Sequence, residues 1–147
     1  MLFFQDILHN RILWASLLAW FIAQLIKVLL TIIFGRQLDL TRFVGSGGMP
    51  SSHTALVVSM ATSIGRVEGF NSTLFALSVI VACIVMYDAA GIRRAAGKQA
   101  AVLNEIVAEL QKSRSIREEK LKELLGHTPI EVLAGAGLGI LISLLII

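Results

Sequence analysis

Residues 73–90 of this chain read TLFALSVIVACIVMYDAA, an apolar run whose single charged residue, Asp88, lies near its end. A helix needs about 20 mostly apolar residues to cross a bilayer, within a range of about 17–25. Two further runs meet this requirement, residues 12–34 and residues 129–147. The three runs predict an integral membrane protein built from helices.

A fourth, shorter segment covers residues 51–65 and is rich in serine and threonine. Lipid offers these hydroxyl groups no hydrogen-bond partners, so we expect this segment to be a span buried among the others. A re-entrant segment is the alternative. The predicted fold class is therefore all-α: one domain over residues 1–147, a polytopic membrane helical bundle of about four transmembrane helices with a cytoplasmic helical hairpin.

The composition agrees with this class. Of the 147 residues, 56% are hydrophobic and 16% are charged, and the mean hydropathy is +0.79. A soluble domain is about 45–50% apolar and about 25% charged. Aromatic residues make up 7%, which gives little basis for a nucleic-acid stacking surface. Cys83 is the only cysteine, so an intrachain disulfide is excluded.

Between the apolar runs 73–90 and 129–147, residues 95–126 carry a dense set of charges. Four apolar residues at helical spacing predict one amphipathic helix: Val102, Ile106, Val107 and Leu110. Ser115 and Glu118 fit a capping box that opens a second helix, which would end at Gly126. We interpret the segment as a solvated helical hairpin.

The basic residues are distributed unevenly between the loops. Ten of the 13 lysines and arginines fall in loops 35–50 and 91–128. Of the other three, Lys27 lies inside the first span, and Arg11 and Arg66 lie on the opposite side of the membrane from these loops. Cytoplasmic loops carry an excess of basic residues. Both larger loops are therefore expected to be cytoplasmic and both termini extracytoplasmic.

This orientation gathers the polar clusters of the chain at the cytoplasmic face. Four clusters are involved: residues 47–54 (GGMPSSHT), Asp88 with Arg93 and Arg94, His127 with Glu131, and Lys27 with Arg36. Ionisable groups within or beside spans are costly to keep, so they mark a functional site by default. Histidines, carboxylates and cations together are the groups that a phosphate-handling site requires.

His127 and Glu131 lie four residues apart at the start of the last span, so their side chains share one helix face. A carboxylate behind an imidazole fixes its tautomer and raises its basicity, as a nucleophilic or general-base histidine needs. Thr128, Pro129 and Glu131 also fit a capping box with proline at the first helical position. The two roles are compatible with each other.

A glycine-rich loop that includes Gly48 leads to Ser51 and Ser52 at the start of the second helical segment. Exposed backbone amides and the positive end of the helix dipole suit such a place to a phosphate. His53, in the first turn, can donate a proton to a leaving oxygen. The structural alternative is a Gly/Pro turn with hydroxyl caps.

Arg93 and Arg94 carry planar guanidinium groups that match phosphate oxygens, and the alternative is that they anchor the cytoplasmic side of the membrane. We expect Asp88 to support the site by pairing with Lys27 or an arginine.

Elsewhere, two glycines in the last span predict close helix packing, within the chain or in a homo-oligomer. These are Gly135 and Gly139.

The motifs resemble those of a known superfamily. Residues 50–53 (PSSH) resemble the central Pro-Ser-Gly-His motif of the type-2 phosphatidic acid phosphatases, and His127-x-x-x-Glu131 resembles the last motif of that superfamily. Three stretches in order, GGMPSSH, DAAGIRR and ELLGHTPIEV, are similar to a divergent bacterial and plastid branch related to acid phosphatases and vanadium haloperoxidases. The resemblance extends over most of the chain.

This resemblance implies hydrolysis of a phosphomonoester through a phosphohistidine, without a metal or other cofactor. His127 would be the nucleophile, Glu131 its orienting acid and His53 the general acid. Arg93 or Arg94 would match the arginine that holds phosphate, although that arginine usually lies within a few residues of the histidine. The full set expected to contact phosphate is Arg93, Arg94, Lys27, Arg36, Ser51, Ser52 and Gly48.

The leading interpretation is a phosphatase in a bacterial-type cell membrane. It would act at the cytoplasmic face on a lipid phosphate monoester or an isoprenoid pyrophosphate. One alternative is a catalytically silent membrane module that binds phospholipid or phosphate. The other is a metal-dependent protein, because two histidines and two carboxylates can ligate zinc. The chain has no paired spacing such as His-x-x-x-His to support a metal.

Overall fold

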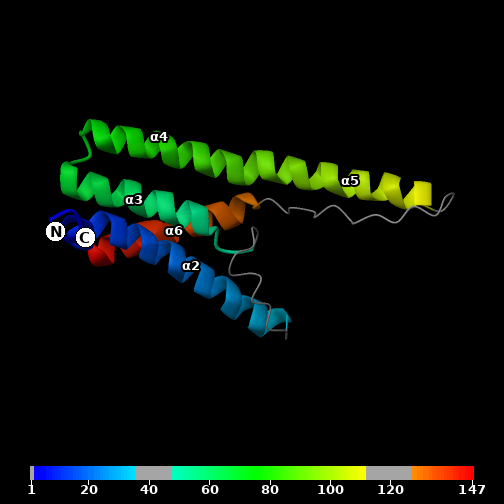
Figure 1. The fold of residues 1–147 in the computed structure, drawn as a ribbon, viewed down its shortest axis with the longest axis horizontal. Helices are drawn as coiled ribbons and strands as arrows, with labels where there is room; N and C mark the ends of the chain where they lie inside the picture. Colours follow the sequence, from blue (N-terminus) through cyan, green and yellow to red (C-terminus); the bar gives the residue numbers. More distant parts are fainter. Residues whose placement is uncertain (1, 36–47, 112–126) are drawn as a thin grey trace.

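The structure is a computed structural model that describes residues 2–35, 48–111 and 127–147. Within these ranges the chain is helical and contains no strand, which confirms the all-α prediction. The helices, shown in Figure 1, are α1 (Leu2–His9), α2 (Arg11–Gly35), α3 (Ser52–Glu68), α4 (Thr73–Tyr87), the π-helical turn η2 (Asp88–Ile92), α5 (Arg93–Gln111) and α6 (Pro129–Ile146).

Helix α3 is the centre of the bundle, because α2, α4 and α6 all pack against it. Small residues make this close packing possible. Ala19 and Ala23 of α2 meet Ala55 of α3 and Ile142 of α6 in the core. The hydroxyl groups of α3 also point inward, and Ser59 and Ser63 are completely buried. The expectation that this serine-rich segment lies buried among the other helices is therefore confirmed.

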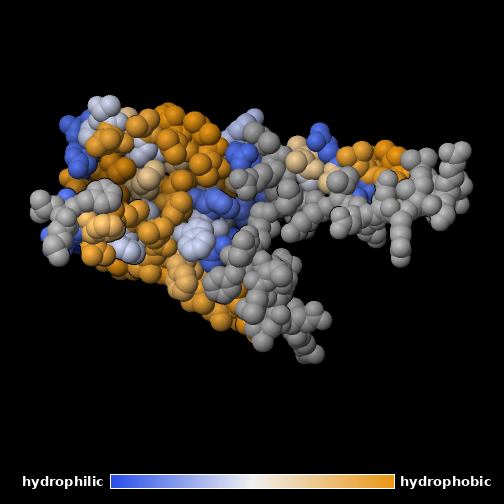
Figure 2. Space-filling view, viewed as in Figure 1, coloured by the Kyte–Doolittle hydropathy of each residue, from blue (hydrophilic) through white to orange (hydrophobic). Residues whose placement is uncertain are grey.

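Three stretches are long and apolar enough to cross a membrane, namely Arg11–Ile33, Thr73–Ala108 and Pro129–Ile146. Helix α3, with 17 residues, is shorter, but it runs from one end of the bundle to the other (Figure 1). A re-entrant segment would return to its starting side, which α3 does not do. Four membrane spans remain a prediction. Figure 2 shows the apolar surface of the bundle with polar surface at either end.

The boundary predicted after residue 90 requires a correction. Helix α4 passes through η2 directly into α5, so the first helix of the expected cytoplasmic hairpin continues the third span without a loop. Figure 1 shows α5 extending beyond the rest of the bundle. The second helix predicted for the hairpin falls within residues 112–126, outside the described residues.

The paired glycines of α6 face α3 of the same chain. A Cβ added at Gly135 would lie 2.4 Å from the Ser51 carbonyl oxygen, and one added at Gly139 would lie 2.6 Å from the Ala55 carbonyl oxygen. Both glycines are buried. The close packing is confirmed, but its partner is internal. Of the two alternatives, packing within the chain or in a homo-oligomer, the structure shows the first at these glycines.

Candidate phosphate site

The first turn of α6 is held by a complete capping box. Thr128 is the N-cap, and its hydroxyl oxygen accepts a hydrogen bond from the Glu131 backbone amide at 3.4 Å. In return, Glu131 Oε2 accepts from the Thr128 amide at 2.9 Å. Pro129 occupies the start of the helix, where its missing N–H costs nothing. The predicted cap is confirmed.

The same carboxylate oxygen orients a histidine. Glu131 Oε2 lies 3.1 Å from His127 Nδ1, and the His127 side chain is only 3% exposed. A carboxylate can only accept hydrogen bonds, so in the neutral ring the proton belongs on Nδ1 and the lone pair on Nε2. Glu131 therefore caps α6 and also contacts His127, so the two roles that the sequence analysis found compatible involve the same carboxylate.

His127 is also fixed through its backbone. Its amide donates to the carbonyl oxygen of Ala89 at 3.0 Å, and Ala89 belongs to η2. A π-helical turn inside an α-helix is rare and frequently occurs at functional sites. This turn ties the end of the third span to the start of α6. No signal in the sequence identified Ala89 as part of the site.

The start of α3 is joined to the same helix end. Ser51 is the N-cap of α3, and its hydroxyl oxygen accepts from Thr54 N at 3.4 Å and from Thr54 Oγ1 at 3.0 Å. The Ser51 amide donates to the Glu131 carbonyl oxygen at 2.9 Å. The Ser51 side chain is completely buried. The first turns of α3 and α6 are therefore adjacent, as the sequence-based site requires.

Lys27 comes to this junction from α2. Its Nζ donates to Ser52 Oγ at 3.2 Å, and its side chain is only 4% exposed. It also interacts electrostatically with Glu131. Gly48 adopts φ +85°, a conformation that favours glycine, and a Cβ built there would lie 4.0 Å from Lys27 Cγ. The loop before α3 thus passes directly over the lysine side chain.

Four of the remaining predicted residues belong to α3, η2 and α5. His53 is exposed on the first turn of α3, and Asp88 is the first residue of η2. Arg93 and Arg94 are the first two residues of α5, and Arg36 lies outside the described residues. In the described part of the chain, no three His, Cys, Asp or Glu residues come together in a way that could hold a metal ion.

Comparisons with known proteins identify the family of the chain. The family model described as "Divergent PAP2 family" matches residues 8–142. The chain is also similar to the "Uncharacterized membrane protein YuiD" of Bacillus subtilis (strain 168), with 42% identity over 153 aligned positions, covering 97% of each chain. No solved structure matches the chain. The resemblance to the divergent phosphatase branch that the motifs indicated is confirmed.

Proposed function

Because the chain belongs to the divergent PAP2 family, we propose that this membrane protein is a phosphatase that hydrolyses a lipid phosphate through a phosphohistidine. The observation that carries the proposal is the His127–Glu131 pair, together with the buried Lys27, which donates to Ser52 at the adjoining start of α3. A basic imidazole nitrogen and a positive charge are the two groups that attack on a phosphate monoester requires.

In the proposed reaction, His127 Nε2 attacks phosphorus while the bond from phosphorus to the lipid oxygen breaks. His53 gives its proton to that leaving oxygen, which departs as the lipid alcohol. Neutral His53 then takes a proton from a water molecule that attacks the phosphohistidine. This second step releases inorganic phosphate and restores both histidines to their starting states.

Lys27 would balance the charge of the phosphate, and Ser52 would act on the phosphate through its hydrogen bond to Lys27. Ser51 would contribute by holding the start of α3 against α6. Arg93 and Arg94 begin α5 next to the turn that anchors His127, so one of them is proposed to bind the phosphate oxygens. Gly48 and Arg36 are proposed to complete the phosphate-binding side of the site.

The site is proposed to face the cytoplasm, with both termini outside. The bias of basic residues supports this orientation. Cysteines placed at two exposed positions in a Cys83→Ser background test it: Lys98→Cys should resist a membrane-impermeant maleimide added to intact cells, whereas Glu68→Cys should react. The reverse labelling pattern would overturn the inward-facing site.

A second candidate function is a membrane module that binds a lipid phosphate without turnover. The near-complete burial of His127 favours it, as does the use of the Ser51 and Ser52 hydroxyl oxygens within the protein. A histidine in such a position can serve the helix cap alone.

The deciding experiment measures release of inorganic phosphate from purified protein in nanodiscs. The panel comprises phosphatidic acid, phosphatidylglycerophosphate, an isoprenoid phosphate, an isoprenoid pyrophosphate and nitrophenyl phosphate. Each is tested with and without a chelator and with orthovanadate. Release that vanadate inhibits and the chelator leaves unchanged supports the phosphohistidine mechanism. Saturable binding of a lipid phosphate with no release from any substrate supports the binding module instead, and loss of activity with the chelator supports a metal enzyme.

A further inference from the structure

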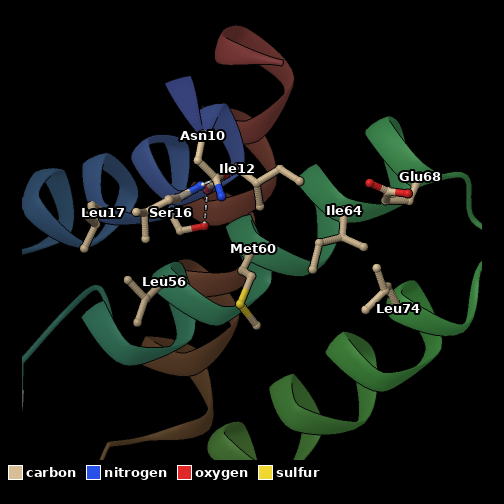
Figure 3. Close-up of a pocket in the computed structure, with 10 residues that line it drawn as sticks. Asn10, Ile12, Ser16, Leu17, Leu56, Met60, Ile64, Glu68 and Leu74 are labelled. Atoms are coloured by element: carbon tan, nitrogen blue, oxygen red, sulfur yellow. Dashed lines mark hydrogen bonds between the residues drawn. The ribbon is translucent and has the colours of Figure 1, made fainter. Parts of the chain in front are cut away.

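An apolar groove of about 470 Å³ lies on α3 between the first half of α2 and the start of α4. Figure 3 shows residues of all three helices around it. Its walls are almost entirely hydrocarbon, contributed by Leu13, Leu17, Leu56, Met60, Ile64 and Leu74. This volume lies within the range of about 300–1,000 Å³ typical of ligand pockets.

On α3, the residues that line the groove lie on the same helix face as Ser52 of the candidate phosphate site. Ser52, Leu56, Met60 and Ile64 occur at every fourth position of α3, so they follow one face of the helix. Ser52 holds Lys27, and Leu56 is the next residue along this face. From Leu56 to Glu68 the groove follows α3 for about 18 Å, at 1.5 Å per residue.

The two ends of this face differ in charge. Lys27 lies at the Ser52 end, whereas Glu68 and Asn10 line the other end of the groove. A phosphate is attracted by the lysine and repelled by the Glu68 carboxylate. An anionic lipid would therefore lie with its head group at Lys27 and its hydrocarbon chain extending toward Glu68. Because α2 and α4 belong to stretches long and apolar enough to cross a membrane, we expect the groove to open to the bilayer interior, where such chains are found.

We propose that the groove between α2 and α4 holds one hydrocarbon chain of a phosphorylated lipid whose phosphate lies at His127 and Lys27. This inference rests on the proposed function of the same site and adds the way in which the substrate is selected. Affinity should increase with chain length until the chain reaches the Glu68 end, and should then level off.

A pair of tryptophan variants tests the groove. Ile64→Trp fills it, and Ile80→Trp adds the same bulk to the exposed face of α4, where the native isoleucine is 58% exposed. We expect Ile64→Trp to raise KM for a long-chain lipid phosphate about tenfold, the factor for displacing two buried methylene groups, while nitrophenyl phosphate turnover is unchanged. Ile80→Trp should alter neither. Equal effects of the two variants would overturn the proposal.

A second measurement uses the unaltered protein and does not depend on turnover. A lipid phosphate with a diazirine at the end of its chain, incorporated in phosphatidylcholine nanodiscs, should form adducts on Met60, Ile64 or Leu74. Excess unlabelled lipid phosphate should suppress these adducts, and the corresponding alcohol should not. Suppression by neither compound would mean that bulk lipid fills the groove, and the proposal would fail.

The two assays separate this inference from the proposed function. Specific adducts in the groove without phosphate release would overturn the phosphatase while supporting the groove as a chain-binding site. Phosphate release with adducts only on the outer face of α4 would support the phosphatase and overturn the groove as a chain-binding site. If Ile64→Trp instead dissociates an oligomer and leaves the chain-length dependence unchanged, the groove binds a second copy of the chain and the proposal is overturned.

Discussion

The two ends of α6 both meet basic side chains, but in different surroundings. At its C-terminal end, Arg11 and Arg66 donate to the carbonyl oxygens of Ile146 and Leu144, and both arginines are exposed. At its N-terminal end the nearby cation is Lys27, which is buried and interacts with Glu131. The last carbonyl groups of any α-helix have no hydrogen-bond partner within the helix. The two arginines supply such partners while they remain in contact with solvent.

The hydrogen bond described for Lys27 goes to the Ser52 hydroxyl and not to a carbonyl group at a helix end. A buried charge within a span is costly, so by default it marks a functional site. The difference between the two ends motivates the proposal that Lys27 binds a ligand, whereas the arginines at the other end bond to helix carbonyl groups. Four pairs of variants, each comparing a residue of the site with a matched control, test this distinction.

The largest effect is expected for the two histidines at opposite ends. His127→Ala should abolish phosphate release and the trapping of a phosphoenzyme, because it removes the attacking nitrogen. His9→Ala should keep full activity, since His9 is exposed and bonds only to the Gln5 carbonyl oxygen of its own helix among the described contacts. The measurement is phosphate release alongside thermal unfolding in detergent. Full activity in His127→Ala would exclude the phosphohistidine.

The second-largest effect is expected for the two basic residues Lys27 and Arg66. Lys27→Met should weaken binding of substrate and vanadate about 10- to 100-fold, because a hydrogen bond to a charged group contributes about 1.5–3 kcal/mol. Its thermal stability should change little, because Lys27 donates to a neutral hydroxyl, Ser52, and the partly exposed Glu131 keeps its bonds to His127 and Thr128. Arg66→Met should do the opposite, leaving binding intact while lowering stability by about 1 kcal/mol or less. Isothermal calorimetry with vanadate and thermal unfolding measure the two quantities. A destabilised Lys27→Met protein with normal binding would make Lys27 a structural residue.

The glycines of α6 test how the site end is assembled. Gly135→Ala should lower the free energy of unfolding by about 1–3 kcal/mol, because the new methyl group would overlap the Ser51 backbone. Gly137→Ala is the control, since its Cβ would meet nothing within 4 Å, and it should be neutral or slightly stabilising. Thermal unfolding compares them. Equal stability of the two variants would mean that α3 and α6 do not pack as closely as described.

The smallest expected effect separates the two roles of Glu131. Thr128→Ala removes the capping hydroxyl and should lower stability by about 0.5–2 kcal/mol. Glu131→Gln removes the charge beside His127 but keeps an oxygen that can cap the helix, so it should lower stability less. Activity should fall about tenfold or more in Glu131→Gln, in line with a lost orienting charge, and should be near normal in Thr128→Ala. Parallel losses of activity in both variants would assign Glu131 to the helix cap alone.

Much of the site could be predicted from the sequence because its strongest interactions are local. A helix brings residues three and four positions apart onto one face, so the cap between Thr128 and Glu131 and the pair between His127 and Glu131 follow from spacing alone. The apolar runs likewise predict membrane-spanning helices, because length and hydropathy are properties of a segment. The motif order was sufficient to indicate the family.

The contacts between segments depended on packing. Lys27 reaches Ser52 across 25 positions, and the amide of His127 finds the carbonyl of Ala89 only because η2 ends beside α6. Hydropathy did not distinguish a loop after the third span from the continuous passage of α4 into α5. Spacing also did not reveal whether the α6 glycines would meet a second copy or α3.

The physical reason is the range over which each interaction acts. Helix geometry and hydrocarbon burial are set by neighbouring residues, so the amino-acid sequence by itself determined the helices, their membrane character and the His127–Glu131 pair. The choice of partners among helices depends on which surfaces interlock most closely. The tertiary structure alone therefore decided that α3 fills the glycine face of α6, that Lys27 contacts the start of α3, and that an apolar groove forms between α2 and α4.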